Sequence, residues 1–497
     1  MSEPREIEIL DARSIEVNLA NLTKSAEQTK EVKASEVDES YSLTARALWV
    51  LAGRTLSFMF GFALPLLLVR RLSQTDFGLY KQVFLFVATS IMILPLGFHM
   101  SAFYFLPRES RQPQIVLNIL LFHLVVAGVA CASLIAYPSI LRTIFNSEDM
   151  VVYSRLIAFV ILTWITSSFM EYVMIAHQEV KLAAILTTVA NLTKSIFLLG
   201  ATIVFGSVRS LIWAAIIQGL LQTVILLVYL RSRFNRFWRS FEWPVMRMQL
   251  SYALPFGFAS MLVWAQSDMH NYFVSYHFGP SAYAIYSIGC FQIPLITILA
   301  ESVGFVMVPR VSYLQKSGNT REIAELIARM VRKLAVPYFP LFVFLLLTGR
   351  EFITVFFTRQ YLSSWPVFAV YLTMIPLSIV VNAYDPVMRA YAEHRFFLLK
   401  FRAFLLVLLF GALWVGTARM GMVGVIMMVV GVGLIERLVM THKMVSILGV
   451  AWRDLAALKD IGKLAGAAVS AGIVTAAVRQ LVLGTRPFIV LSICGVV

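Results

Sequence analysis

Cysteine is scarce in this chain, with three residues among 497, and no Cys, His, Asp or Glu cluster has the spacing of a metal site. A P-loop and a nucleotide-binding segment are also lacking, so ATP is not a direct energy source. We therefore expect no metal, no cofactor and no disulfide framework. The three cysteines all lie in apolar runs, at Cys131, Cys290 and Cys494.

Long polar stretches are rare after the first 45 residues. The chain is 59% apolar with a mean hydropathy of +0.79, and a bilayer core requires about 20 apolar residues in a helix. The apolar runs are too long and too uniform for the alternating strands of a membrane barrel. We predict an all-α polytopic membrane protein. Twelve spans are expected near 47–69, 83–105, 115–137, 156–176, 182–206, 210–230, 251–277, 281–309, 334–357, 366–388, 396–417 and 420–442, and a thirteenth near 461–483.

The spans divide the chain into two lobes of six helices. Residues 1–45 are polar and rich in Glu and Ser, as in a disordered cytoplasmic tail, and they lack the apolar core of a signal peptide. The end of the chain, 487–497, is apolar but short, which fits either a piece of a fourteenth span or an interfacial segment. The expected parts are the tail 1–45, the N-lobe 46–231, a linker 232–250, the C-lobe 251–443 and extra C-terminal span or spans 444–497.

Acidic residues are fewer than basic ones: the chain has 27 Asp and Glu and 42 Lys and Arg, which gives a formal net charge of +15. Loops that follow even-numbered spans carry about twice as many Lys and Arg as loops that follow odd-numbered spans. Cytoplasmic loops hold this excess, so we predict a cytoplasmic N-terminus in a bacterial cytoplasmic (inner) membrane. The excess of Lys and Arg in the loops on one side of the membrane accounts for most of the positive charge. We therefore expect no nucleic-acid partner.

One motif occurs in both halves. Residues 171–181 and 385–395 share the pattern acid-x-Val-Met-x-Ala-x-x-Glu-x-base, at an offset of 214 (385 minus 171). Two like halves favour a transporter over an enzyme, because alternating access moves one repeat against the other. The duplicated acids are expected to have a structural role at a cytoplasmic gate: Glu171, Asp385, Glu179 and Glu393.

Charged side chains at span depth are costly and therefore mark candidate sites. Arg54 and Lys194 either form a cationic patch in a cavity or take part in an internal ion pair or a headgroup contact. Arginine suits phosphate because its planar fork donates two parallel hydrogen bonds. Asp268 and Glu301 either carry a coupling ion or pair with those cations. His270 is a polar core residue or a proton relay.

Other polar and aromatic residues surround Asp268 in the sequence. Gln266 joins His270 as a candidate cavity residue, and Trp264, Tyr272 and Tyr276 either stack on sugar rings or pack. Two cytoplasmic segments, 231–249 and 319–333, have the composition of segments that lie on anionic headgroups. We expect membrane lipids to contact both.

The run from Arg70 through Phe77-Gly-Leu-Tyr80 to Tyr104-Phe-Leu-Pro-Arg-Glu109 resembles the opening of polysaccharide repeat-unit flippases. The stretch from Ala253 through Asp268 to Ser287 resembles their seventh and eighth helices. These exporters belong to the multidrug/oligosaccharidyl-lipid/polysaccharide (MOP) superfamily. The resemblance implies flipping of an undecaprenyl-diphosphate-linked oligosaccharide through a cationic cavity, with the polyprenyl-diphosphate-linked glycan, membrane lipids and other polysaccharide-assembly membrane proteins as partners.

Two other functions remain open at this point. A multidrug or small-molecule exporter of the same superfamily would have an acidic cavity, which Arg54 argues against. A membrane glycan polymerase or ligase would have a large outer loop with catalytic residues. The longest outer loop here, about 137–155, offers only the adjacent acids Glu148 and Asp149.

Overall fold

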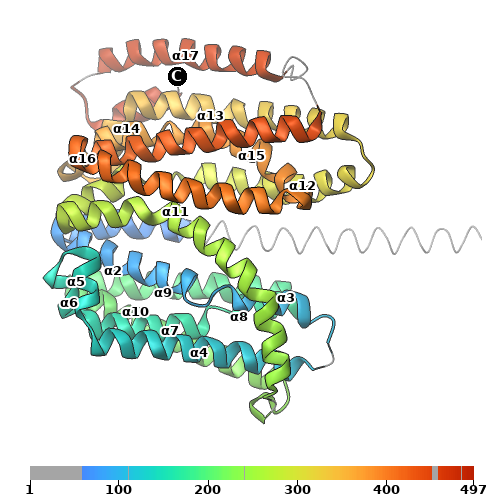
Figure 1. Cartoon of the computed structure of the whole chain (residues 1–497). Helices are drawn as coiled ribbons and strands as arrows, with labels where there is room; N and C mark the ends of the chain where they lie inside the picture. Colours follow the sequence, from blue (N-terminus) through green and yellow to red (C-terminus); the bar gives the residue numbers. More distant parts are fainter. Residues whose placement is uncertain (1–58, 110, 240, 450–456, 483, 497) are drawn as a thin grey trace, which may run out of the picture.

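The computed structural model describes residues 59–109, 111–239, 241–449, 457–482 and 484–496. The predicted tail and Arg54 lie outside the described residues. All regular secondary structure in the described ranges is helical. Ten of these helices are long and apolar enough to cross a membrane, which confirms the predicted fold class. Two groups of helices lie one above the other in Figure 1, and α11 runs diagonally from one to the other.

The described part of the N-lobe starts within a helix at residues 59–71, which ends before Ser73. The Ser73 hydroxyl caps the next helix by accepting a hydrogen bond from the Asp76 amide at 3.1 Å. Its other elements are α2 (Gln74–Ile93), η1 (Phe98–Met100), α3 (Ser101–Phe105), α4 (Gln112–Ala136), α5 (Ser139–Phe145), α6 (Glu148–Val152), α7 (Ser154–Ser167), α8 (Met170–Ala176), α9 (Val180–Phe205) and α10 (Val208–Arg233).

The connection between the lobes is η2 (Phe237–Arg239) followed by α11 (Trp243–Gly289). Val245 and Ala253 of α11 are buried with N-lobe side chains, whereas Val274 and Tyr286 are buried in a second core cluster further along the helix. The chain turns sharply at Gly279, whose φ of 77° suits a residue without Cβ. His270 and Tyr286, on the two sides of this turn, share a 2.8 Å hydrogen bond, so the last part of α11 folds back beside the first. The long part of α11 that precedes Gly279 therefore joins the two lobes.

The predicted span 281–309 is not one continuous helix. α11 ends at Gly289, residues 290–293 are not helical, and α12 (Pro294–Lys316) follows. Pro294 starts α12 because proline suits the first turn, where its missing N–H is not needed. The prediction was wrong here because apolar character continues through the interruption.

The C-lobe continues with α13 (Thr320–Phe357), which extends the predicted span 334–357 by more than three turns. The segment 319–333 was expected to lie on headgroups, but Ile323, Ile327 and Met330 are at most 5% exposed and belong to the protein core. The apolar face of this amphipathic segment packs on the C-lobe. The remaining elements are η3 (Arg359–Ser364), α14 (Trp365–Tyr371), α15 (Met374–Ala390), η4 (Ala392–His394), α16 (Arg395–Leu448), α17 (Ala457–Val482) and α18 (Pro487–Val496).

Predicted spans 11 and 12 are the two parts of α16, which are separated by a sharp turn at Gly421 (φ 63°, ψ −150°). The chain reverses there, because Arg402 in the first part forms an ion pair with Glu436 in the second, 34 residues later (436 minus 402). The duplicated motif occupies the same kind of turn in both lobes. Ala176 ends α8 and Ala390 ends α15, again 214 residues apart (390 minus 176), and α9 and α16 begin shortly afterwards. The repeat in the sequence is thus a repeat of structural elements.

Side chains from the two lobes are hydrogen-bonded at the end of the bundle that contains Thr358, which we call the Thr358 end. Gln360 donates to the Val69 carbonyl at 3.1 Å, Gln74 donates to the Gln360 carbonyl at 3.4 Å, and Ser281 donates to the Gln74 side chain at 2.9 Å. We call the opposite end, with the connection between α10 and α11, the Glu242 end. The described lobes are thus linked directly at the Thr358 end.

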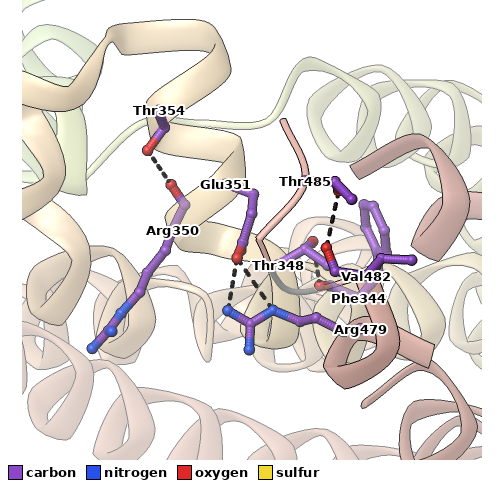
Figure 2. Close-up of polar contacts among 8 residues, drawn as sticks. All are labelled: Phe344, Thr348, Arg350, Glu351, Thr354, Arg479, Val482 and Thr485. Carbon is purple, nitrogen blue, oxygen red and sulfur yellow. Dashed lines mark hydrogen bonds and ion pairs between the residues drawn. The ribbon is translucent and has the colours of Figure 1, made fainter. Parts of the chain in front are cut away.

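The extra helix α17 is attached to α13 by an ion pair. Figure 2 shows the Arg479 guanidinium facing the Glu351 carboxylate, with the shorter contact at 2.7 Å. Only 13% of the Glu351 side chain and 26% of the Arg479 side chain are exposed. The neighbouring Arg350 points away from this pair and is exposed.

Candidate functional site

A cavity of about 930 Å³ lies between α2, α11, the interrupted segment 290–293, α12, α14, α15 and α16. The helix interruption brings the amino end of α12 to its wall, through Gln292, Ile293 and Thr297. The charged and polar side chains that line it are Lys81, Ser267, Asp268, His270, Asn271, Ser287, Gln292, Thr297, Ser378 and Arg437.

Lys81 is contributed by α2 of the N-lobe. It lies seven residues after Gln74, so it is about 10 Å into the helix. Its ammonium group lies 5.7 Å from the centre of the Phe77 ring. Among the described residues Lys81 has no carboxylate within ion-pair distance. The N-lobe therefore contributes a positive charge to a cavity whose other described walls are formed by α11, residues 290–293, α12, α14, α15 and α16.

Arg437 is contributed by α16 and is held in place by uncharged groups. Its Nε donates to the Leu377 carbonyl at 3.0 Å, and one terminal nitrogen donates to the Gly433 carbonyl at 2.8 Å. The neighbouring residue in the sequence, Glu436, forms an ion pair with Arg402, with 3.7 Å between its carboxylate oxygen and a guanidinium nitrogen. Within the described part of the chain, the Arg437 guanidinium is thus fixed without a counter-ion.

Asp268 is the acid of the cavity wall. Its Oδ1 accepts a hydrogen bond from the Asn271 amide at 3.1 Å, and no described Lys or Arg forms an ion pair with it. His270 also lines the cavity, is 8% exposed, and shares a 2.8 Å hydrogen bond between its Nδ1 and the Tyr286 hydroxyl. With His270 neutral, Lys81, Arg437 and Asp268 sum to a charge of +1.

Gln266 lines a smaller neighbouring cavity of about 270 Å³ instead. Its amide nitrogen donates to Glu436 at 3.3 Å, and its carbonyl oxygen is buried without a hydrogen-bond partner in the described structure. Arg437 lines both cavities, so the two are neighbours. Asp385 lines the smaller cavity and pairs with Arg389 at 2.7 Å.

Two further residues that were predicted for the site, Lys194 and Glu301, are on α9 and α12. Lys194 is on α9, with its ammonium 4.4 Å from the centre of the Trp164 ring. Glu301 is exposed on α12. Neither is among the residues that line the two cavities.

The predicted gate acids lie near the turns that follow the fourth span of each lobe. Glu179 pairs with Arg233 at 2.9 Å, Glu171 is half-buried on α8, and Glu393 is exposed in η4. Together with the Asp385 pair, these are local contacts beside the two repeated turns. Their role at a gate stays a prediction.

Sequence reasoning missed Lys81 and Arg437. Lys81 was assigned to a loop because the predicted second span began at residue 83, whereas α2 begins at Gln74. Arg437 lies inside the predicted span 420–442, so the rule that selected Arg54 would also have selected it. The signal was present in the sequence for Arg437 and was hidden by the span boundary for Lys81.

Solved membrane transporters have the same fold. A lipid II flippase, MurJ, in an inward closed conformation is 14% identical, with a TM-score of 0.68 over 90% of this chain and 98% of that one. An inward-facing multidrug resistance MATE family transporter of the MOP superfamily is 13% identical, with a TM-score of 0.60 over 79% and 95%. A MOP superfamily transporter from Pyrococcus furiosus is 12% identical, with a TM-score of 0.55 over 82% and 96%. No curated protein matches the chain.

The helical bundle, the interrupted eighth span and the polar cavity define a multi-pass membrane protein with the MOP fold. A family model described as polysaccharide biosynthesis protein matches residues 67–366, which is 300 of the 497 residues. The chain therefore belongs to that polysaccharide biosynthesis family.

Proposed function

We propose that the protein is a flippase that carries a polyprenyl-diphosphate-linked glycan across the bacterial cytoplasmic membrane for polysaccharide synthesis. The observation that carries this proposal is the pair of cations, Lys81 and Arg437, in a cavity of about 930 Å³ within the helical bundle. Membership of the polysaccharide biosynthesis family supports the substrate class.

The diphosphate is the part of this substrate that most needs compensation for lost water. Arg437 offers a guanidinium whose position is fixed by two backbone carbonyls, and Lys81 offers a point charge from the other lobe. The amino end of α12 adds the positive end of a helix dipole to the cavity wall. Interrupted transporter helices use such ends to bind anionic groups of their substrates. The lipid tail stays in the bilayer while the polar head crosses within the protein.

Sidedness follows from the loop charges. The Glu242 end holds the basic loops, and cytoplasmic loops carry that excess, so we assign this end and the N-terminus to the cytoplasm. Hydrogen bonds between the lobes at the Thr358 end then close the outer side. This arrangement suits loading from the cytoplasmic leaflet, followed by rocking of the lobes and release outside.

Release requires weakening of the phosphate contacts. Asp268 lies on the same cavity wall and becomes a competitor for the cations when a coupling ion or proton leaves it. Glu301, which does not line the cavity, is the second candidate for binding the coupling ion. We keep Lys194, which does not line the two cavities, and Arg54, which lies outside the described residues, as proposed supporting cations. The driving force is an ion gradient, the membrane potential or the gradient of the substrate.

Export of organic cations is the competing function, because Asp268 could hold a cation in the same cavity. The charge of +1 on Lys81, Arg437 and Asp268 together opposes it. Drug susceptibility of a deletion strain separates the two functions. If the protein exports cations, the deletion strain should be more susceptible to cationic drugs, and its lipid-linked glycans should be unchanged.

The decisive experiment for the proposed function is deletion of the gene followed by analysis of lipid-linked glycans. We expect an undecaprenyl-diphosphate-linked oligosaccharide to accumulate on the cytoplasmic leaflet and the corresponding polysaccharide to be lost. Normal glycan levels in both leaflets would rule out the flippase function.

Variants of the two cations test the assigned site. A charge-assisted hydrogen bond contributes about 1.5–3 kcal/mol, so Lys81→Gln and Arg437→Gln should each weaken binding of undecaprenyl diphosphate by roughly 10- to 100-fold. Arg419→Gln removes an exposed charge from the part of α16 that precedes Gly421 and should leave binding unchanged. Equal effects of all three variants would refute the site, provided that membrane levels and melting temperatures match.

A further inference from the structure

Three side chains on one face of α11 form a wall of the large cavity. Trp264, Asp268 and Asn271 are spaced i, i+4 and i+7, which places them on the same side of a helix with 3.6 residues per turn. All three line the cavity. They lie on the lobe-joining helix, whereas Lys81 and Arg437 come from α2 and α16.

This wall combines an apolar plane with a polar edge. The Trp264 ring is half-buried, and within the described residues it has no aromatic or cationic partner at its face. One turn further along, the Asp268 carboxylate uses Oδ1 to accept from Asn271 at 3.1 Å. The Asp268 carboxyl group retains further acceptor capacity whether it is protonated or ionised, and Asn271 retains an acceptor and a second donor hydrogen.

We propose that Trp264, Asp268 and Asn271 form a sugar subsite for the pyranose next to the diphosphate, an inference that rests on the proposed function. A pyranose has a C–H face that packs on an aromatic plane and equatorial hydroxyls that donate to a carboxylate. Buried apolar rings with a few placed polar groups are the usual composition of a small-molecule site. The cations hold the diphosphate, and this wall holds the sugar.

The structure distinguishes Trp264 from the other aromatic residues considered from the sequence. Tyr272 lies 5.5 Å from the Phe145 ring between ring centres, and Tyr276 is 42% exposed beside His277. Neither lines the large cavity. Of these three aromatic residues, Trp264 alone faces the cavity and can stack on a ligand there.

An aromatic ring beside a carboxylate could instead hold an organic cation. Lys81 and Arg437 line the same cavity and disfavour a free cation, whereas they favour a ligand that also carries phosphate. Sugar recognition is therefore the better fit, and binding of tetraphenylphosphonium serves as the test of the alternative.

The test compares two ligands on the full chain in lipid nanodiscs: undecaprenyl diphosphate, and the undecaprenyl-diphosphate-linked glycan purified from the deletion strain. We expect the wild-type protein to bind the glycan-bearing ligand at least tenfold more tightly. Trp264→Ala should abolish this preference and leave affinity for undecaprenyl diphosphate unchanged. Trp264→Phe should retain part of the preference, and Asp268→Asn should reduce it.

The control is Trp213→Ala, which removes an exposed indole from α10 outside the cavity and should preserve the tenfold preference. Equal affinity of the wild-type protein for both ligands, or equal weakening of both by Trp264→Ala, would overturn the sugar subsite alone. Failure of the wild-type protein to bind either ligand would overturn the proposed function as well. Displacement of the glycan-bearing ligand by tetraphenylphosphonium, with loss in Asp268→Asn, would show a cation site instead.

Discussion

Single charged residues inside this bundle are stabilised in two different ways. Glu351 and Arg479 neutralise each other between α13 and α17 (Figure 2), whereas Arg437 is held by carbonyl oxygens beside a cavity. A neutralised pair attaches one helix to another. A fixed charge without a described counter-ion is available to a ligand, which is why we assign the substrate site to Arg437.

The Glu351–Arg479 pair permits a stability prediction. Removing one partner leaves a largely buried charge uncompensated, which costs about 3 kcal/mol, so Arg479→Gln should lower the melting temperature of the purified protein. The double variant Glu351→Gln/Arg479→Gln should recover part of that loss. Arg350→Gln, at the exposed neighbour, should have almost no effect. Additive losses in the double variant would show that the pair is not coupled.

At the scale of elements, the turn between α13 and η3 is strained. Thr358 has a φ of 76° and a ψ of 162°, a region that a β-branched residue rarely occupies. Its hydroxyl is also buried without a hydrogen-bond partner among the described residues, as are those of Tyr361 and Ser364. The packing around this turn therefore keeps Thr358 in a backbone conformation that its own side chain disfavours.

Relief of this strain should stabilise the protein. Positive φ costs roughly 1–3 kcal/mol, and glycine loses about 0.5–1 kcal/mol in chain entropy, so Thr358→Gly should raise stability by about 1 kcal/mol in a thermal melt. Thr354→Gly is the matched control, because Thr354 lies in helix α13 one turn earlier (Figure 2). It should destabilise by about 1 kcal/mol. A loss of stability in both variants would contradict the assignment of strain to Thr358.

At the scale of the whole molecule, the alternating access that we propose requires the lobes to separate at the Thr358 end. Three hydrogen bonds between Gln74, Gln360, Val69 and Ser281 oppose that separation. Each contributes about 0.5–1.5 kcal/mol, so Gln74→Ala/Gln360→Ala should shift the population toward the outward-open state by roughly 100-fold. Faster labelling of Ser364→Cys by an impermeant thiol reagent in a cysteine-free background would reveal the shift.

The control for this shift is Gln315→Ala, which removes the same kind of side chain near the carboxyl end of α12. This position is close to the amino end of α13, whereas Thr358 follows the carboxyl end of α13. It should leave labelling of Ser364→Cys unchanged. Slower or equal labelling in the Gln74/Gln360 variant would mean that these bonds do not hold the Thr358 end closed.

Much of the architecture could be predicted because membrane insertion imposes its pattern directly on the sequence. Apolar runs predicted the spans, and the motif at residues 171–181 and 385–395 predicted a repeat whose turns the structure contains. The interruption at 290–293 could not be predicted, since Phe291 and Ile293 continue the apolar pattern there. The buried face of 319–333 was missed because an amphipathic helix looks the same on a membrane and on a protein core.

The sequence by itself determined the class of protein, since length, hydropathy and loop charge are one-dimensional consequences of a bilayer. It also placed Asp268 and His270 among the candidates, because a polar group at span depth is costly wherever its helix packs. Only the tertiary structure decided that Lys81 and Arg437, 356 residues apart (437 minus 81), line one cavity without a counter-ion in the described structure. Charge pairing depends on which helices are neighbours, and adjacency of Glu436 and Arg437 in the chain does not reveal that Glu436 faces Arg402 instead.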